Sequence, residues 1–76
     1  MKESDWMNLQ LGDRISSTIS PYAQNLIVDE ICEDERFLKN WWARGYPNAK
    51  RLCKMVREND SFHTWNVDFS QWEKNK

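Results

Sequence analysis

The chain has 76 residues and a nearly balanced charge, with 11 lysines and arginines against 12 aspartates and glutamates. This length gives one domain with a small core, and five tryptophans supply large side chains that can fill it. Two glycines, two prolines and no low-complexity run exclude extensive disorder, and no apolar stretch has the length of a bilayer span or of a signal peptide.

The first part of the chain is expected to hold an N-terminal arm and one helix. Residues 1–10 form the arm, with an apolar anchor around Trp6. A short segment spans residues 11–20, and Pro21 disfavours helix at the residue before it but suits the first turn of a new helix. Over residues 22–33 apolar side chains recur at helical spacing, and this pattern predicts a helix.

Two further helices are predicted in the middle of the chain. Asp34 is a good N-cap residue, and the apolar side chains after it lie on one face of a helix over residues 34–44. Gly45 and a proline two residues later end that helix. Apolar residues at i, i+3, i+4 and i+7 then predict a helix over residues 48–59.

The C-terminal extension, residues 62–76, is rich in tryptophan and has the weakest pattern. Its first part, residues 62–72, fits a helix or a hairpin. We choose the helix, because Trp65, Phe69 and Trp72 recur at i, i+4 and i+7. The sequence therefore predicts a single all-α domain over residues 1–76, a compact bundle of four to five short helices joined by short turns.

The two central helices and the turn between them resemble the helix-turn-helix of the Cro and lambda-repressor type of regulators, over about residues 11–56. Residues 11–15 are similar to the opening of the family's first helix, Gln24 stands where the family has a glutamine, and Asp34 stands where its recognition helix begins. Residues 42–47 are similar to the family's Trp-x-x-Gly-x-x-Pro region. The family's core positions are matched by Ile27, Val28 and Ile31, and its apolar-x-x-Trp spacing is matched by Leu38 and Trp41.

This resemblance implies a transcriptional regulator of phage or mobile-element type that reads double-stranded DNA and has no catalytic activity. The helix over residues 34–44 would enter the major groove, and a homodimer would bind a two-fold operator. The candidate surface for the dimer or for a protein partner consists of Trp65, Phe69 and Trp72. Base-reading roles are assigned to Glu35, Arg36, Lys39 and Asn40, and phosphate contacts to Gln24, Arg44, Lys50 and Arg51.

The distribution of charge also points to a polyanionic partner. Residues 36–57 carry seven cations and no carboxylate, whereas the segments on either side are net acidic. The cations are Arg36, Lys39, Arg44, Lys50, Arg51, Lys54 and Arg57. An unbroken basic segment is a candidate footprint for nucleic acid, although a solvated helix face has the same composition.

A second function, from another class, competes with DNA binding. Residues 29–30 and 33–35 are all carboxylates, which are too acidic for a surface that faces phosphate. They provide either solubility and helix capping or a docking patch for a basic partner. On the second interpretation the chain is a small acidic phage-type protein that binds and inhibits a host protein, without DNA binding.

The sequence offers no motif of an enzyme or of a metal site. His63 is the only histidine, and no nucleophile with an orienting carboxylate is suggested around it. Cys32 and Cys53 do not form a CxxC pair. We therefore expect no catalysis, no metal and no cofactor. Free cysteines are typical of a reducing compartment, so we expect a cytoplasmic protein that makes no membrane contact.

Overall fold

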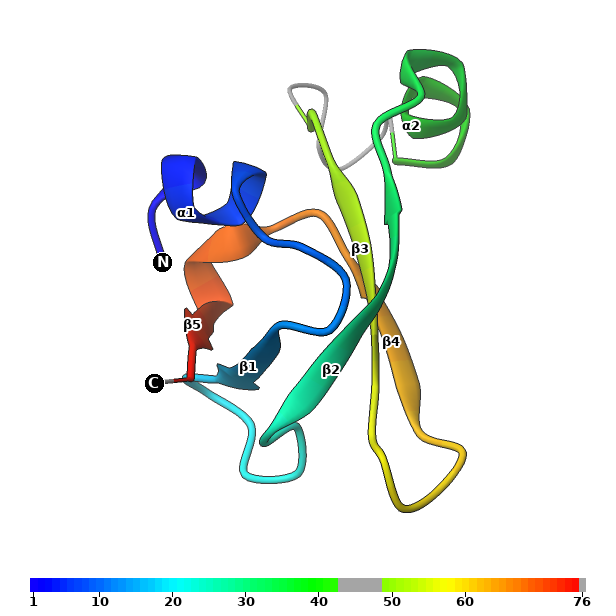
Figure 1. Cartoon of the computed structure of the whole chain (residues 1–76). Coiled ribbons are helices and arrows are strands. Elements are labelled where there is room, and N and C mark those ends of the chain that lie inside the picture. Colours follow the sequence, from blue (N-terminus) through cyan, green and yellow to red (C-terminus); the bar gives the residue numbers. More distant parts are fainter. Residues whose placement is uncertain (43–48, 76) are drawn as a thin grey trace.

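The computed structural model describes residues 1–42 and 49–75, and this part of the chain is mainly β-sheet (Figure 1). Its strands are β1 (Arg14–Ser17), β2 (Leu26–Cys32), β3 (Leu52–Val56), β4 (His63–Asn66) and β5 (Trp72–Lys74). Its helices are α1 (Glu3–Met7), α2 (Glu35–Trp42) and the 3-10 turn η1 (Phe69–Gln71). The strands form one antiparallel sheet in the order β4-β3-β2-β1-β5. Neither α-helix of the described residues approaches the length and apolar character that crossing a membrane requires.

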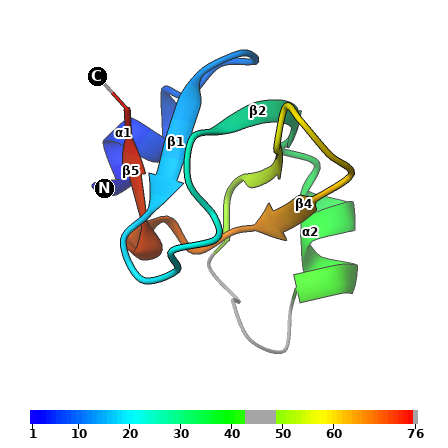
Figure 2. The ribbon, with the colours of Figure 1, turned by 90° about the horizontal axis from the view of Figure 1, so that it is seen from below.

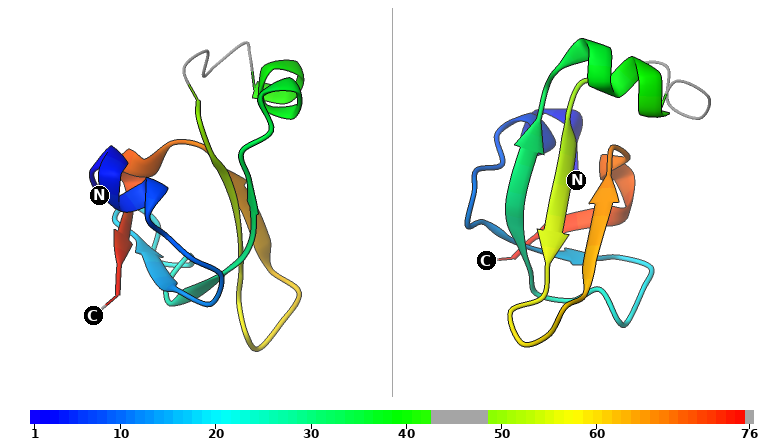
Figure 3. Two further views of the ribbon diagram at one scale, coloured as in Figure 1. Left: turned by 45° about the horizontal axis from the view of Figure 1, so that its top comes forward. Right: turned by 90° about the vertical axis from the view of Figure 1, so that its right-hand side faces the viewer.

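The sheet is strongly bent, so that its two ends lie on different sides of the molecule. β1 pairs with β5 and with the first residues of β2, while the rest of β2 pairs with β3, and β3 pairs with β4. In Figure 1 the β1–β5 pair stands apart from β3 and β4, and the view from below in Figure 2 shows β5 beside β1. α1 lies near η1, and α2 follows the far end of β2 (Figure 3).

The main hydrophobic core fills the space inside the bend. Its side chains come from α1, from the residues after it and from both parts of the sheet. Trp6 and Leu9 are each 2% exposed, and they anchor the N-terminal arm in this core. Ile15 of β1, Leu26 of β2 and Met55 of β3 are fully buried there. Burial of these side chains provides the main stabilisation of such a small domain.

A second, smaller cluster lies on the outer face of β2, β3 and β4. Leu38 of α2 is buried there together with Leu52 and Val67. The half-buried side chains of Phe37 and Trp65 pack against this cluster. Because side chains alternate between the two faces of a strand, β3 contributes to both clusters. α2 is therefore held on the sheet by its apolar face.

The expected all-α bundle is wrong, and so is the resemblance to a helix-turn-helix regulator. β2 and β3 occupy the segments that the periodicity assigns to helices over residues 22–33 and 48–59, and β1 occupies the segment likened to the family's first helix. Apolar runs this short fit helical and strand spacing equally well. The β-branched residues Ile27, Val28 and Ile31 favour the strand, because their side chains pack well on a pleated surface.

One of the predicted helices is present, and its N-cap is the predicted one. Asp34 precedes α2, and its Oδ1 accepts a hydrogen bond from the backbone N–H of Arg36 at 2.9 Å. Its carbonyl oxygen accepts a hydrogen bond from the N–H of Leu38 at 3.0 Å. Asp34 therefore satisfies donors of the first turn. α2 extends to Trp42, and the predicted end at residue 44 lies outside the described residues.

The helix chosen for residues 62–72 is wrong, and a hairpin does not form either. β4 and β5 lie at opposite edges of the sheet, one paired with β3 and the other with β1. Between them, Asp68 caps η1: its Oδ1 accepts the hydroxyl of Ser70 at 2.6 Å and the N–H of the same residue at 3.0 Å. These two hydrogen bonds hold the pKa of the Asp68 carboxyl below its usual value.

Candidate functional site

Four cations of the central basic segment are paired with carboxylates in the folded chain. The pairs, with their N–O distances, are Lys50–Glu3 at 3.2 Å, Arg51–Glu33 at 3.4 Å, Lys54–Asp29 at 3.8 Å, Lys54–Glu30 at 4.0 Å and Arg57–Asp60 at 2.7 Å. All five of these carboxylates belong to the acidic segments that flank the basic one in sequence. Paired charges cancel each other's field at a distance. The described residues therefore do not present the unbroken basic surface that the sequence suggests.

Among the described residues expected to contact phosphate, Gln24 is separated from the adjacent pair Lys50 and Arg51. Gln24 lies in the β1–β2 connection, where its Nε2 donates to two nearby backbone carbonyl oxygens at 2.9 and 2.8 Å. That connection and α2 lie at opposite ends of the molecule in Figure 1. Lys50 is exposed, whereas Arg51 is only 9% exposed. Arg44 lies outside the described residues.

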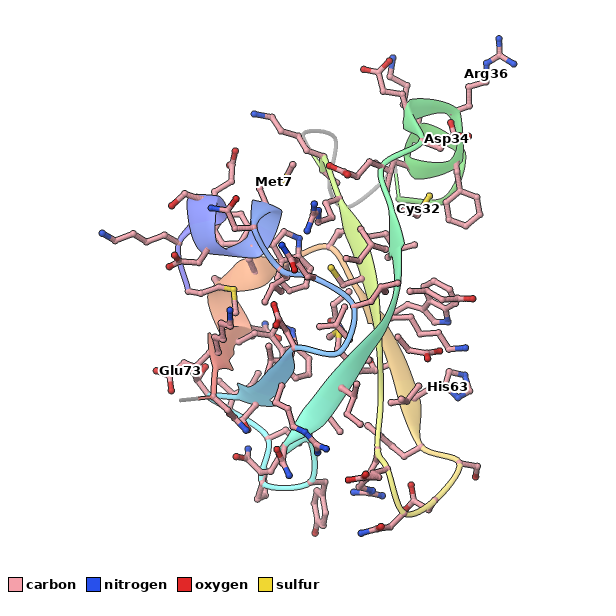
Figure 4. The ribbon with its side chains drawn as sticks, viewed as in Figure 1. Met7, Cys32, Asp34, Arg36, His63 and Glu73 are labelled. Atoms are coloured by element: carbon pink, nitrogen blue, oxygen red, sulfur yellow. The ribbon has the colours of Figure 1, made fainter. Side chains whose placement is uncertain are left out.

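The expected base-reading residues do share a helix. Glu35, Arg36 and Lys39 are exposed on α2. Figure 4 shows Arg36 pointing away from the body of the molecule. Asn40 also belongs to α2, but its side chain lies outside the described part of the structure. α2 thus presents two cations and one carboxylate to solvent.

The three aromatic residues expected to form a partner surface are separated. Trp65 packs on the outer face of the sheet, and the Lys54 ammonium lies 5.4 Å from the centre of its ring. Phe69 and Trp72 belong to the main core instead, and Trp72 is only 4% exposed. Of this set, Trp65 alone contributes to the groove described next.

An open groove of about 680 Å³ runs beside β2, and we call it the β2 groove. Leu9 and Leu11 line it on the side of the N-terminal segment, and Phe37 and Trp65 line it on the side of α2. Cys32 also lines the groove and marks its position in Figure 4. Its charged lining consists of Asp29, Glu30, Glu33 and Arg51. The groove thus combines large apolar side chains with a cluster of carboxylates.

The carboxylates of the β2 groove are more accessible than the cations paired with them. The side chains of Asp29, Glu30 and Glu33 are 49%, 54% and 51% exposed. Lys54, which pairs with the first two, is 25% exposed, and the Arg51 side chain is 10% exposed. The cations therefore lie beneath the carboxylates, and a molecule that enters the groove meets an acidic surface.

Arg51 holds the N-terminal wall of the groove in place. Its Nη1 donates to the carbonyl oxygens of Leu9 at 2.7 Å and Trp6 at 3.1 Å. In return, the indole N–H of Trp6 donates to the backbone carbonyl of Arg51 at 3.2 Å. Since these groups are buried, each hydrogen bond is costly to break. Arg51, expected to contact phosphate, here joins the arm to β3.

The two cysteines differ in environment, and neither forms a disulfide. Cys53 is fully buried, and desolvation by burial raises the pKa of its thiol to about 12. Cys32 is half-buried at the groove. Within the described residues, no group of three or more histidine, cysteine, aspartate and glutamate side chains is placed to hold a metal ion.

Comparison with family models, curated proteins and solved structures gives no match for this chain. The assignment of a site therefore depends on the chain's own geometry. From the sequence, the carboxylates of residues 29–30 and 33–35 provide either solubility and helix capping or a docking patch, and the apolar lining from Leu9, Leu11 and Phe37 was not predicted. The exposure of Leu11, at 65%, is the one unusual feature of these residues, and it is visible only in the folded chain.

Proposed function

We propose that this protein is a small protein-binding module without catalytic activity, and that the β2 groove holds a basic segment of a partner protein. The observation that carries the proposal is the layered charge of the groove, with Asp29, Glu30 and Glu33 half exposed above less exposed cations. A segment rich in lysine or arginine is complementary to these carboxylates, and its apolar atoms are complementary to the rest of the lining. Cys32 and Cys53 of this chain form no disulfide, which fits a reducing compartment, so the proposal places the protein in the cytoplasm.

Binding of double-stranded DNA through α2 is the rival function, and it stays a prediction, as do the homodimer and a regulatory role. It is supported by the exposure of Arg36 and Lys39 on α2, where Arg36 points away from the body of the molecule (Figure 4). Two observations support the protein-binding proposal instead. The cations of the basic segment form ion pairs with carboxylates, and Gln24 lies apart from the other described residues that were expected to contact phosphate.

Selection from a random-peptide library tests the proposal without knowledge of the natural partner. The recovered peptides are expected to be rich in lysine and arginine, and their affinity is expected to fall as salt is added. Binding to the variant Glu30→Gln with Glu33→Gln should be roughly tenfold weaker, since two accessible charges are lost. This variant leaves Lys54 its contact with Asp29 and leaves Arg51 its carbonyl partners, so we expect it to fold.

Glu73→Gln is the matched control, because it removes one exposed carboxylate of β5, which does not line the groove (Figure 4). Affinity for the peptides should be unchanged in this variant. Recovery of no peptides, or of peptides without cations, would overturn the proposal. Equal binding to the groove variant and the wild type would overturn it as well. A gel shift of duplex DNA that is lost with Arg36→Ala and Lys39→Ala would establish the rival function.

A further inference from the structure

Half of β2 has an edge that no other strand of the described residues covers. On the β1 side, the paired residues of β2 are Leu26 and Ile27. The contact extends to Val28, whose N–H donates to Asp13 O and whose carbonyl accepts the N–H of Gly12, both at 2.9 Å. Beyond Val28, no backbone hydrogen bond between described residues reaches this edge of the strand. The remaining residues of β2 form the border of the β2 groove.

The backbone of Ile31 is directed toward this open edge. Along an antiparallel strand, the N–H and C=O groups of successive residues alternate between the two neighbours. Val28 gives both groups to the β1 side, and a register shift between Val28 and Glu30 adds one residue, Asp29. The alternation then directs the backbone N–H and C=O of Glu30 toward Lys54 of β3. It directs the backbone N–H and C=O of Ile31 toward the open edge. Ile31 thus offers, beside the groove, one donor and one acceptor without a partner in the part of the chain that the structure describes.

We infer that the partner's basic segment binds as an extended strand, adding to β2 at this edge. The inference rests on the proposed function and specifies how the β2 groove holds its ligand. Backbone hydrogen bonds to Ile31 would supply the pairing, as in other cases of strand addition. Alternate side chains of the segment would face the carboxylates of the groove and the exposed side chain of Leu11. The expected ligand therefore alternates cationic and apolar residues.

The same edge is poorly suited to a second copy of this chain. Pairing of two copies at this edge would bring Asp29 and Glu30 of one close to the same carboxylates of the other, and like charges across a strand pair are destabilising. A bulge and charged side chains also prevent unselected strands from adding to an edge. A cationic strand escapes this repulsion, so the carboxylates select among partners.

N-methylation of peptide backbones provides the test on the ligand. In a peptide recovered from the library, each backbone N–H is replaced in turn by N–CH₃. Each replacement removes one hydrogen-bond donor and leaves the side chains unchanged. In the bound segment, we expect an about tenfold loss of affinity at the one position whose N–H donates to the carbonyl oxygen of Ile31, and unchanged affinity at the positions beside it. The unaffected positions serve as internal controls. Unchanged affinity at every position, or similar losses at neighbouring positions, would overturn the inference.

Amide hydrogen exchange provides the matching test on the protein. The N–H of Ile31 should exchange with solvent faster than that of Glu30 in the free protein, and it should slow at least tenfold when peptide saturates the groove. An unchanged exchange rate for Ile31 at saturation would overturn strand addition. Peptide binding that still requires Glu30 and Glu33 would then leave the proposed function standing, whereas absence of any peptide binding would overturn both.

Discussion

Replacement of Arg51 by methionine tests whether this buried guanidinium is structural. Methionine retains the apolar stem and removes the two hydrogen bonds to the carbonyl oxygens of Trp6 and Leu9. Hydrogen bonds to a charged group contribute about 1.5–3 kcal/mol each. The carbonyl oxygen of Trp6 keeps the backbone N–H of Leu9 as a donor at 3.3 Å, whereas the carbonyl oxygen of Leu9 loses the donor that Arg51 supplies. We expect Arg51→Met to lower the free energy of unfolding by about 3 kcal/mol. This is a large part of the roughly 4–11 kcal/mol typical of a chain of this length.

Urea unfolding followed by tryptophan fluorescence measures this loss. For a domain of this size, about 3 kcal/mol lowers the midpoint by roughly 2–3 M urea. Lys50→Met is the matched control, because its ion pair with Glu3 joins side chains that are 67% and 54% exposed. Exposed pairs contribute little, so this variant should lose less than about 0.5 kcal/mol. Equal losses in the two variants would refute the assignment of Arg51 as the link between the arm and β3.

Three further predictions concern buried or capped groups. Trp6→Phe should lower the free energy of unfolding in urea by about 1 kcal/mol more than Trp72→Phe does. The reason is that the indole N–H of Trp6 has an acceptor, whereas the buried indole N–H of Trp72 has none within the described residues. Equal losses in the two variants would contradict this. A maleimide at about pH 8 should modify Cys32 and spare Cys53, whose raised pKa keeps it a thiol, and peptide mass spectrometry would reveal the opposite order. The pKa of Asp68 is lowered in the folded chain, so its stabilising contribution is complete above about pH 4 and is lost as the pH falls through the folded pKa. Asp68→Asn should therefore lose less stability than the wild type between about pH 5 and pH 2, and parallel urea midpoints would contradict the cap.

Local signals predicted α2 but not the sheet. Asp34 is recognisable as an N-cap from its side chain alone, because the hydrogen bond that it makes is local. The pairings of β1 with β5 and of β2 with β3 depend instead on contacts between residues far apart in the sequence. Spacing of apolar residues does not reveal such contacts, and in short runs it also fits a helix. Strand propensity of the β-branched residues in β2 was the available signal, and it was outweighed by the apparent periodicity.

The candidate site was predictable in its charge but not in its shape. The carboxylates at residues 29–30 and 33–35 are visible in the sequence, and a docking patch was one of the two interpretations that they allowed. The seven cations of residues 36–57 were misleading, because a linear count ignores the pairing of Lys54 and Arg51 with β2 and the residue after it. The groove itself requires the bend of the sheet and the position of Leu11, which are properties of the tertiary structure.

The facing charges of β2 and β3 have a consequence for how the chain folds. In the unfolded chain, the acidic segment over residues 29–35 and the basic segment over residues 50–57 attract each other before any strand exists. Within a Debye length of about 8–10 Å at physiological ionic strength, this attraction favours encounters between the segments that later pair. Added salt is therefore expected to slow refolding more than it accelerates unfolding. The charge pattern that gives the chain its near-zero net charge would then accelerate the pairing of β2 with β3 during folding.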